Sequence, residues 1–156
     1  MTNAIFAYRL TSPTWEREAF TGRGAKLFGG RWNVEGTPVV YTAENRSLAI
    51  LELLVHADDP EALVNRIVLR VEFDRSLLEI APQSSLTWIA KGDYGLSREF
   101  GTKWIEESRS AVLRVPTAIT PAEVNYLINP AHPDFKKIKI SKPVPFRIDP
   151  RLFKRG

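Results

Sequence analysis

Residues 38–73 read PVVYTAENRSLAILELLVHADDPEALVNRIVLRVEF, and this stretch decides the fold class. Its first six residues, 38–43, are apolar and β-prone, and its last ten, 64–73, alternate with a period of two, which is typical of strands. The apolar side chains that share one face of the second strand are Ile67, Leu69, Val71 and Phe73. Between the two strands the pattern predicts a helix over 46–57, with Asn45 as its N-cap.

Further elements on either side of this stretch are short. Strands are expected at 5–10, 110–116, 123–130 and 138–148, the last interrupted by its two prolines. Helical pattern recurs only at 97–108, with a third, short helix expected near 61–64 or 13–20. Strands dominate and do not alternate regularly with long helices. We therefore expect an α+β fold with a mixed sheet rather than a doubly wound parallel sheet.

Length and composition limit the class of protein. A chain of 156 residues with 44% hydrophobic and 26% charged residues is typical of one soluble domain, which we expect to span 1–156. The absence of cysteine excludes disulfides, Cys-ligated zinc and a thiolate nucleophile. No leader-like segment and no long apolar run is present, so we expect a cytoplasmic protein without a membrane span.

Positive charge gathers near the C-terminus. The net charge is +4, and residues 136–156 hold eight Lys or Arg against one acid, Asp149. These charges are either a solvated surface or a contact for an acidic partner or nucleic acid. The segment 137–146, KIKISKPVPF, alternates polar and apolar residues and predicts a half-buried strand. A nucleic-acid-binding module is disfavoured because no aromatic residues interleave these charges.

The helix expected over 46–57 contains the most informative acid. Seven of the eight residues from Leu48 to Val55 are apolar, which predicts a helix buried nearly all round. The exception is Glu52. A carboxylate in such a helix requires partners, so Glu52 is either a structural anchor paired with an Arg or with backbone amides, or a group held in a cleft for a substrate.

Residues 22–33, GRGAKLFGGRWN, place four glycines before Arg31 and Trp32. Glycine-rich turns can direct consecutive backbone N–H groups at one anion, and Arg matches phosphate oxygens in pairs. The stretch nevertheless fits neither the Rossmann fingerprint nor a P-loop, so a tight surface turn is the alternative. Arg9 and Tyr41 either line a shared pocket or are ordinary strand residues, and Trp32 is expected in the core or in a lid.

Two other kinds of site lack support. His56 and His132 are far apart in the sequence and, without cysteine, give no metal-ligand spacing, so each is expected to be structural. No GxSxG motif is present, which argues against a serine hydrolase.

The segments GGRWN, PVVYTA, LAILE and NYLINPAHPDF together resemble the RES-domain family, the toxins of bacterial toxin–antitoxin pairs. The resemblance runs from about Tyr8 to Phe135. It implies a fold like that of ADP-ribosylating toxins, with a mostly antiparallel sheet and few helices, and it implies NAD⁺ as substrate with no metal.

The resemblance also implies a set of site residues. Arg31, Tyr41 and Glu52 match the active-site positions of the family, and Arg9 matches an earlier arginine. The family serine falls in the segment Val115–Thr117, where this chain has threonine. The remaining positions that follow the family pattern are Gly29, Gly30, Asn125 and Asn129.

On this interpretation Arg9 or Arg31 holds the pyrophosphate, the glycines let the ligand approach the backbone, and Tyr41 packs on nicotinamide or ribose. Glu52 stabilises the oxocarbenium-like transition state. The acceptor of ADP-ribose is water or phosphate, or alternatively the side chain of a specific protein. The resemblance further implies an antitoxin partner and allows a homodimer.

Overall fold

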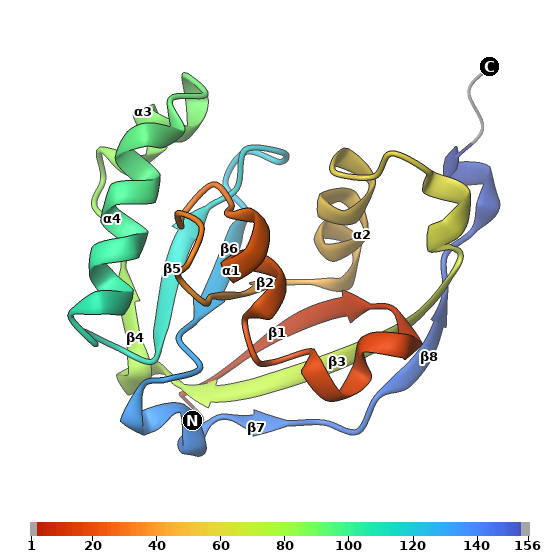
Figure 1. Ribbon diagram of the computed structural model, residues 1–156, viewed down its shortest axis with the longest axis horizontal. Coiled ribbons are helices and arrows are strands. Elements are labelled where there is room, and N and C mark those ends of the chain that lie inside the picture. Colours follow the sequence, from red (N-terminus) through yellow and green to blue (C-terminus); the bar gives the residue numbers. More distant parts are fainter. Residues whose placement is uncertain (1–2, 154–156) are drawn as a thin grey trace.

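The computed structural model describes residues 3–153, and Figure 1 shows its elements. The α-helices are α1 (Arg23–Phe28), α2 (Arg46–Val55), α3 (Ser85–Ala90) and α4 (Tyr94–Glu106). The strands are β1 (Ala4–Thr11), β2 (Val40–Ala43), β3 (Asn65–Asp74), β4 (Leu78–Ile80), β5 (Val112–Pro116), β6 (Val124–Ile128), β7 (Lys139–Ile140) and β8 (Val144–Arg147).

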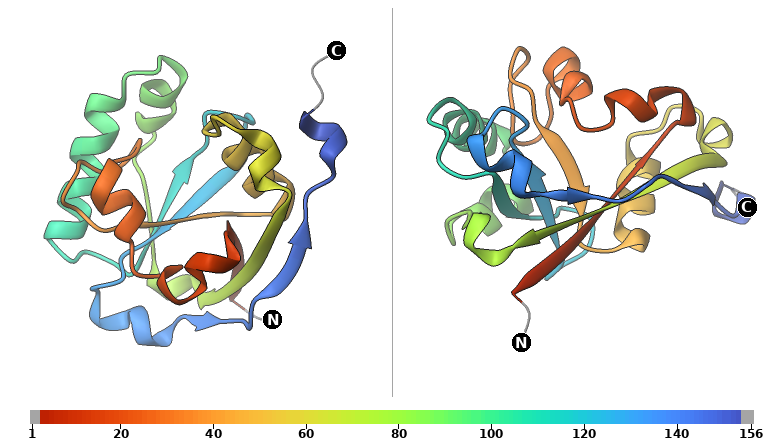
Figure 2. Two further views of the ribbon diagram at one scale, coloured as in Figure 1. Left: turned by 45° about the vertical axis from the view of Figure 1, so that its right-hand side comes forward. Right: turned by 90° about the horizontal axis from the view of Figure 1, so that it is seen from below.

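The strands form one continuous, curled sheet. Their order is β4-β5-β6-β2-β1-β3-β7, with β8 also paired to β3, and within residues 3–153 only the pair β4 and β5 is parallel. Strands β1 and β2 share a single register pair, Tyr8 with Ala43, so the sheet turns sharply there. In Figures 1 and 2 the strands β5 and β6, on one side of this turn, run in a different direction from β1 and β3 on the other side. The α+β class and the mostly antiparallel sheet expected from the sequence are confirmed.

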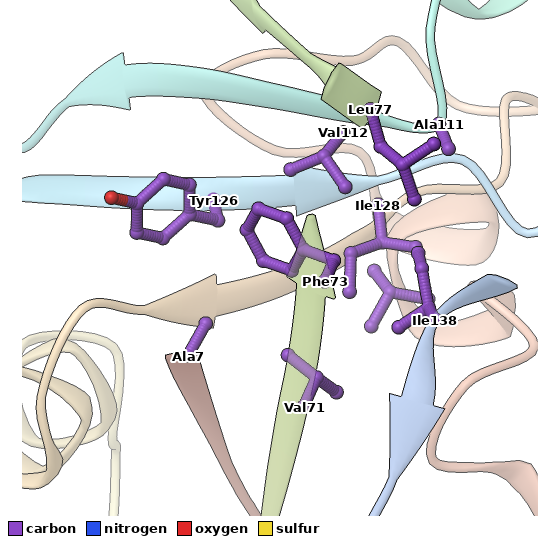
Figure 3. Close-up of a cluster of buried hydrophobic side chains, with 10 residues drawn as sticks. Ala7, Val71, Phe73, Leu77, Ala111, Val112, Tyr126, Ile128 and Ile138 are labelled. Atoms are coloured by element: carbon purple, nitrogen blue, oxygen red, sulfur yellow. The ribbon is translucent and has the colours of Figure 1, made fainter. Parts of the chain in front are cut away.

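The largest core cluster fills the inside of this turn. Alternation along β3 buries the four side chains that the sequence assigns to one face. Two of them, Val71 and Phe73, meet Val112 of β5 and Ile128 of β6 in the cluster of Figure 3. The ring of Phe73 lies edge-on to that of Tyr126, with centroids 5.4 Å apart. Side chains from both halves of the sheet therefore hold its bend in place.

Helix α2 begins as predicted, because the Asn45 side chain accepts a hydrogen bond from the Leu48 amide at 2.7 Å. The expectation that it is buried nearly all round is wrong. Only Leu48 and Ala49 are buried, while Leu51 and Val55 are 37% and 55% exposed. The reason is that α2 packs mainly against β1 and β2, and its residues on the other faces are half-buried or exposed.

Several short elements differ from the sequence-based expectation. Helix α1 lies inside the stretch expected to be a turn, and α3 and β4 were not expected. The segments 13–18 and 60–63 both form 3₁₀-helices, whereas a short helix was expected at only one of these two places. The second long helix starts at Tyr94, three residues before its expected start, because Asp93 caps it by accepting from the Gly95 amide.

The expected half-buried strand at 137–146 is only partly present. Prolines divide it into the edge strands β7 and β8, which pair with β3. Ile138 is buried, but Ile140 and Val144 are 40% and 55% exposed. An edge strand has no second layer to cover its outer face, so alternation alone overestimates burial here.

No helix within residues 3–153 is long and apolar enough to cross a membrane.

Candidate active site

A cleft of 580 Å³ is lined by residues of the α1–β2 segment, strand β1 and helix α2. It brings together residues from six separate parts of the sequence. Of the nine positions that the resemblance indicates, all but Asn129 line it: Arg9, Gly29, Gly30, Arg31, Tyr41, Glu52, Thr117 and Asn125. A second hollow, of 490 Å³, lies on the far side of the Pro116–Ala118 segment and shares only Thr117 with this set.

Glu52 lies at the centre of the hydrogen bonds in the cleft. Its Oε1 accepts from the Thr117 hydroxyl at 2.7 Å and from the Asn125 amide at 2.8 Å. Its Oε2 lies 3.6 Å from Arg31 Nη1 and 3.9 Å from His56 Nε2, and receives no hydrogen bond from residues 3–153. One carboxylate oxygen is therefore fixed by two neutral donors, while the other is available to a ligand.

Arg31 faces this free oxygen from the opposite wall. Both side chains of the pair are about one-fifth exposed, and their distance is that of a loose ion pair rather than a short charge-assisted hydrogen bond. The Arg31 guanidinium also lies 5.3 Å from the centre of the Tyr94 ring, at the start of α4. Arg31 thus retains hydrogen-bonding capacity toward the cleft.

Tyr41 contributes its ring to the cleft, while its hydroxyl is engaged in the wall. The hydroxyl donates to Asn33 Oδ1 at 2.6 Å and accepts from the Trp32 amide at 3.1 Å. Burial raises the pKa of Tyr41, and the Trp32 hydrogen bond and the cations Arg98 and Arg31 only partly offset this effect. The hydroxyl consequently stays protonated at neutral pH and does not act as a base there.

Arg9 adds a second cation at the base of the cleft. Its Nη1 donates to the Tyr41 carbonyl at 3.0 Å, and its buried Nε has no acceptor among residues 3–153. Burial lowers the pKa of Arg9 to about 10, so the group remains charged at pH 7. Asn125, which lines the same cleft, has a buried Oδ1 that receives no hydrogen bond from residues 3–153. Unpaired buried groups of this kind favour a polar ligand that completes them.

Gly29 and Gly30 do not form the anion-binding turn that the sequence predicts. Their N–H groups do not point together at an anion, because Gly29 donates to the Ala25 carbonyl at 2.8 Å and Gly30 to the Asn33 carbonyl at 3.0 Å. At Gly30 a Cβ atom would lie 2.6 Å from the Tyr41 hydroxyl and 2.8 Å from Asn33 Oδ1. Gly30 therefore lets the loop lie against Tyr41, and any ligand contact is through Cα rather than N–H.

Replacing Gly30 by alanine should lower the free energy of unfolding by about 1–3 kcal/mol, because the added methyl group displaces the Tyr41 hydroxyl. Gly24→Ala is the matched control, since nothing lies within 4 Å of a Cβ there and the site is helical. Urea unfolding measures both variants. Equal stability of Gly30→Ala and the unmodified chain would show that this close approach is not needed.

Other expectations have mixed outcomes. Trp32 is buried in the core, as expected. His132 caps a 3₁₀-helix by accepting from the Asp134 amide, which is a structural role. His56, in contrast, lines the cleft beside Glu52. Asn129 does not reach the cleft: it is fully buried at the far end of β6, where its side chain accepts from the Ala131 amide.

Sequence reasoning also missed two buried residues that shape the site. Asn33 is fully buried, and its amide donates to the carbonyls of Ala25, Val34 and Thr37, which closes the loop. Ser97 on α4 donates to the Arg31 carbonyl. The only signal for Asn33 is its place in the GGRWN segment, and none marks Ser97.

The arrangement suits an anionic ligand with a sugar. Two cations can meet phosphate, and a carboxylate oxygen can accept from a hydroxyl. Within residues 3–153 no group of three or more His, Asp or Glu side chains could hold a metal ion.

The profile of the RES domain family matches residues 6–149. A toxin of Sphingobium sp. (strain YBL2), described as a Prs ADP-ribosylating toxin, is 38% identical over the whole of both chains. A protein of Photorhabdus laumondii described as Toxin Res is 41% identical over 96% of this chain and 98% of that protein.

Among solved structures, a chain of the M. tuberculosis MbcT–MbcA toxin–antitoxin complex superposes with a TM-score of 0.72 over 96% of this chain and 87% of that chain. At 19% identity this likeness shows a shared fold.

Proposed function

The chain belongs to the RES-domain family, and from this premise we propose that it is a toxin whose cleft binds NAD⁺ and cleaves the bond between nicotinamide and ribose. The observation that supports this most is the Glu52 carboxylate. It has one oxygen fixed by Thr117 and Asn125 and the other free, opposite a guanidinium.

The reaction follows from the charges in the cleft. As the C1′–N1 bond breaks, its electron pair leaves with nicotinamide, and positive charge spreads over C1′ and the ring oxygen of the ribose. Glu52 Oε2 accepts a hydrogen bond from a ribose hydroxyl and lies near this charge. Because the charge exists only in the transition state, its stabilisation raises the rate rather than substrate affinity. An acceptor oxygen then bonds to C1′ and loses its proton.

The cations and the aromatic ring position the substrate. Arg31 is at the mouth of the cleft and Arg9 at its base, so the pyrophosphate has a guanidinium partner at either depth. The buried Arg9 Nε is a donor without an acceptor among residues 3–153, and a phosphate oxygen of the substrate would serve as that acceptor. Tyr41 offers its ring to the nicotinamide or ribose, while Gly29 and Gly30 leave room beside it.

Water or phosphate is the proposed acceptor, which makes the protein a toxin that depletes NAD⁺. A protein side chain is the second candidate, and the relative described as a Prs ADP-ribosylating toxin favours it, because that relative matches this chain over its whole length. A cognate antitoxin is the proposed partner, since the structural neighbour comes from a toxin–antitoxin complex. A homodimer and a cytoplasmic location stay predictions.

Incubating the purified protein with NAD⁺ labelled in the adenosine, with and without cell lysate, tests the proposal. Nicotinamide release is expected in both cases. Free ADP-ribose or its phosphate indicates depletion, and label on a discrete protein band indicates transfer to a target. Intact NAD⁺ under both conditions, with folded protein, contradicts the proposed function.

Phe28 provides a prediction about the other end of the substrate. Its ring is 81% exposed, although it lines the cleft at the end of α1. Stacking of adenine on such a ring is worth about 1–3 kcal/mol. Phe28→Ala should therefore raise the KM for NAD⁺ and the inhibition constant of AMP by roughly tenfold and leave kcat unchanged.

The neighbouring Leu27 is 54% exposed but does not line the cleft, so Leu27→Ala is the control and should change neither constant. Steady-state kinetics distinguish the outcomes. A fall in kcat with an unchanged KM in Phe28→Ala would place the ring at the nicotinamide end instead.

A further inference from the structure

The first half of α4 holds the backbone of the loop that carries Arg31. Arg98 Nε donates to the Gly30 carbonyl at 2.9 Å, the Ser97 hydroxyl donates to the Arg31 carbonyl at 2.5 Å, and the Thr102 hydroxyl accepts from the Val34 amide at 3.2 Å. Figure 1 shows this loop, in orange, running beside the green helix. Three successive contacts along one helix face therefore fix a loop more than sixty residues earlier in the sequence.

Close packing accompanies these hydrogen bonds. Ser97 and Gly101, one turn apart on α4, are buried. A Cβ at position 101 would lie 1.9 Å from the Trp32 carbonyl oxygen, so only glycine lets the helix lie this close to the loop. Helix and loop are therefore in direct contact next to Arg31.

The same turn of α4 contacts the Arg31 side chain. Its guanidinium lies 5.3 Å from the centre of the Tyr94 ring, and the Tyr94 carbonyl is a second acceptor of the Ser97 hydroxyl, at 3.2 Å. Ser97 thus joins the peptide of Arg31 to the residue on which the guanidinium rests. The hydroxyl therefore contacts both the backbone from which the Arg31 side chain starts and the turn of α4 next to its guanidinium.

We propose that Ser97 is a positioning residue that aims the Arg31 guanidinium at the free oxygen of Glu52 and at the substrate. This inference rests on the proposed function. Without the hydroxyl, the Arg31 peptide can rotate, and the guanidinium spends less time in the geometry that the reaction needs. Small displacements of this kind are costly to a reaction that depends on orientation.

Ser97→Ala tests the inference, with Ser110→Ala as the matched control. Ser110 also donates to a backbone carbonyl, that of Val112 at 2.8 Å, and lies beyond the far end of α4. Ser97→Ala should lower kcat/KM for NAD⁺ roughly tenfold and Ser110→Ala should not. In an Arg31→Lys background Ser97→Ala should have little further effect, because both changes disable the same group. Equal losses in the two serine variants, or multiplicative losses with Arg31→Lys, overturn the inference.

Hydrogen exchange gives a readout that needs no activity. Ser97→Ala should speed amide exchange in residues 29–34, and Ser110→Ala should leave that segment unchanged. If the unmodified protein does not convert NAD⁺, the proposed function fails, while the exchange result still decides whether Ser97 fixes the loop. If the protein is active but Ser97→Ala changes neither exchange nor kinetics, only the positioning role fails.

Discussion

Glu52→Gln should lower NAD⁺ turnover by roughly 10²- to 10⁴-fold. Glutamine keeps the shape of the side chain, and its oxygen can still accept from Thr117 and Asn125, as Oε1 does now. The remaining atom becomes an NH₂ group in front of Arg31, where it can neither accept from a ribose hydroxyl nor stabilise positive charge on the sugar. The loss should appear in kcat, because the interaction is strongest in the transition state.

Nicotinamide release under saturating NAD⁺ measures this effect. Glu79→Gln is the control, since Glu79 also forms an ion pair with an arginine, Arg109 at 2.7 Å, on another part of the surface. It should turn over NAD⁺ normally. A folded Glu52→Gln protein with near-normal turnover would remove Glu52 from its catalytic role.

Arg31→Lys should lower kcat/KM for NAD⁺ by roughly 10²-fold. Lysine keeps the positive charge but not the planar fork, so it cannot meet two phosphate oxygens at once or place a planar cation beside the Tyr94 ring, 5.3 Å from its centre, as arginine does. The size of the loss in kcat/KM therefore shows how much the shape of the Arg31 guanidinium contributes beyond its positive charge.

The chain offers a close control for this change. Arg109 also pairs with a carboxylate, Glu79, and lies 4.9 Å from the centre of an aromatic ring, Phe100, outside the cleft. Arg109→Lys should lose the same planar fork and a similar ring contact without loss of turnover. If Arg31→Lys retains wild-type kcat/KM, a charge at this position is sufficient and the fork is irrelevant.

The main lines of the fold were accessible from the sequence because they depend on local periodicity. Alternation along residues 65–74 specifies a buried face, and the Asn45 cap marks the start of α2. The burial of α2 was overestimated because a helical wheel counts apolar residues, whereas burial depends on how many neighbours surround the helix. Helix α1 was missed because four nearby glycines weaken the helical signal.

The site, too, has residues that the sequence indicates and residues that only the structure shows. The assembly of Arg31, Tyr41, Glu52, Thr117 and Asn125 in one cleft agrees with the positions that the family resemblance indicates. Ser97 was not predicted, because one serine on a polar helix carries no pattern, and its contact with Arg31 spans 66 residues. The resemblance could not show that the Gly29 and Gly30 amides are already engaged within the loop, since this depends on the path of the backbone.

In the proposed reaction Glu52 faces the ribose of NAD⁺ across the cleft from the arginines. A crystal structure of the Glu52→Gln protein with NAD⁺ bound tests this arrangement. We expect a ribose hydroxyl within hydrogen-bonding distance of side chain 52 and the pyrophosphate against Arg9 or Arg31. NAD⁺ bound outside this cleft, or within it with the nicotinamide ribose turned away from residue 52, would contradict the proposed role of Glu52.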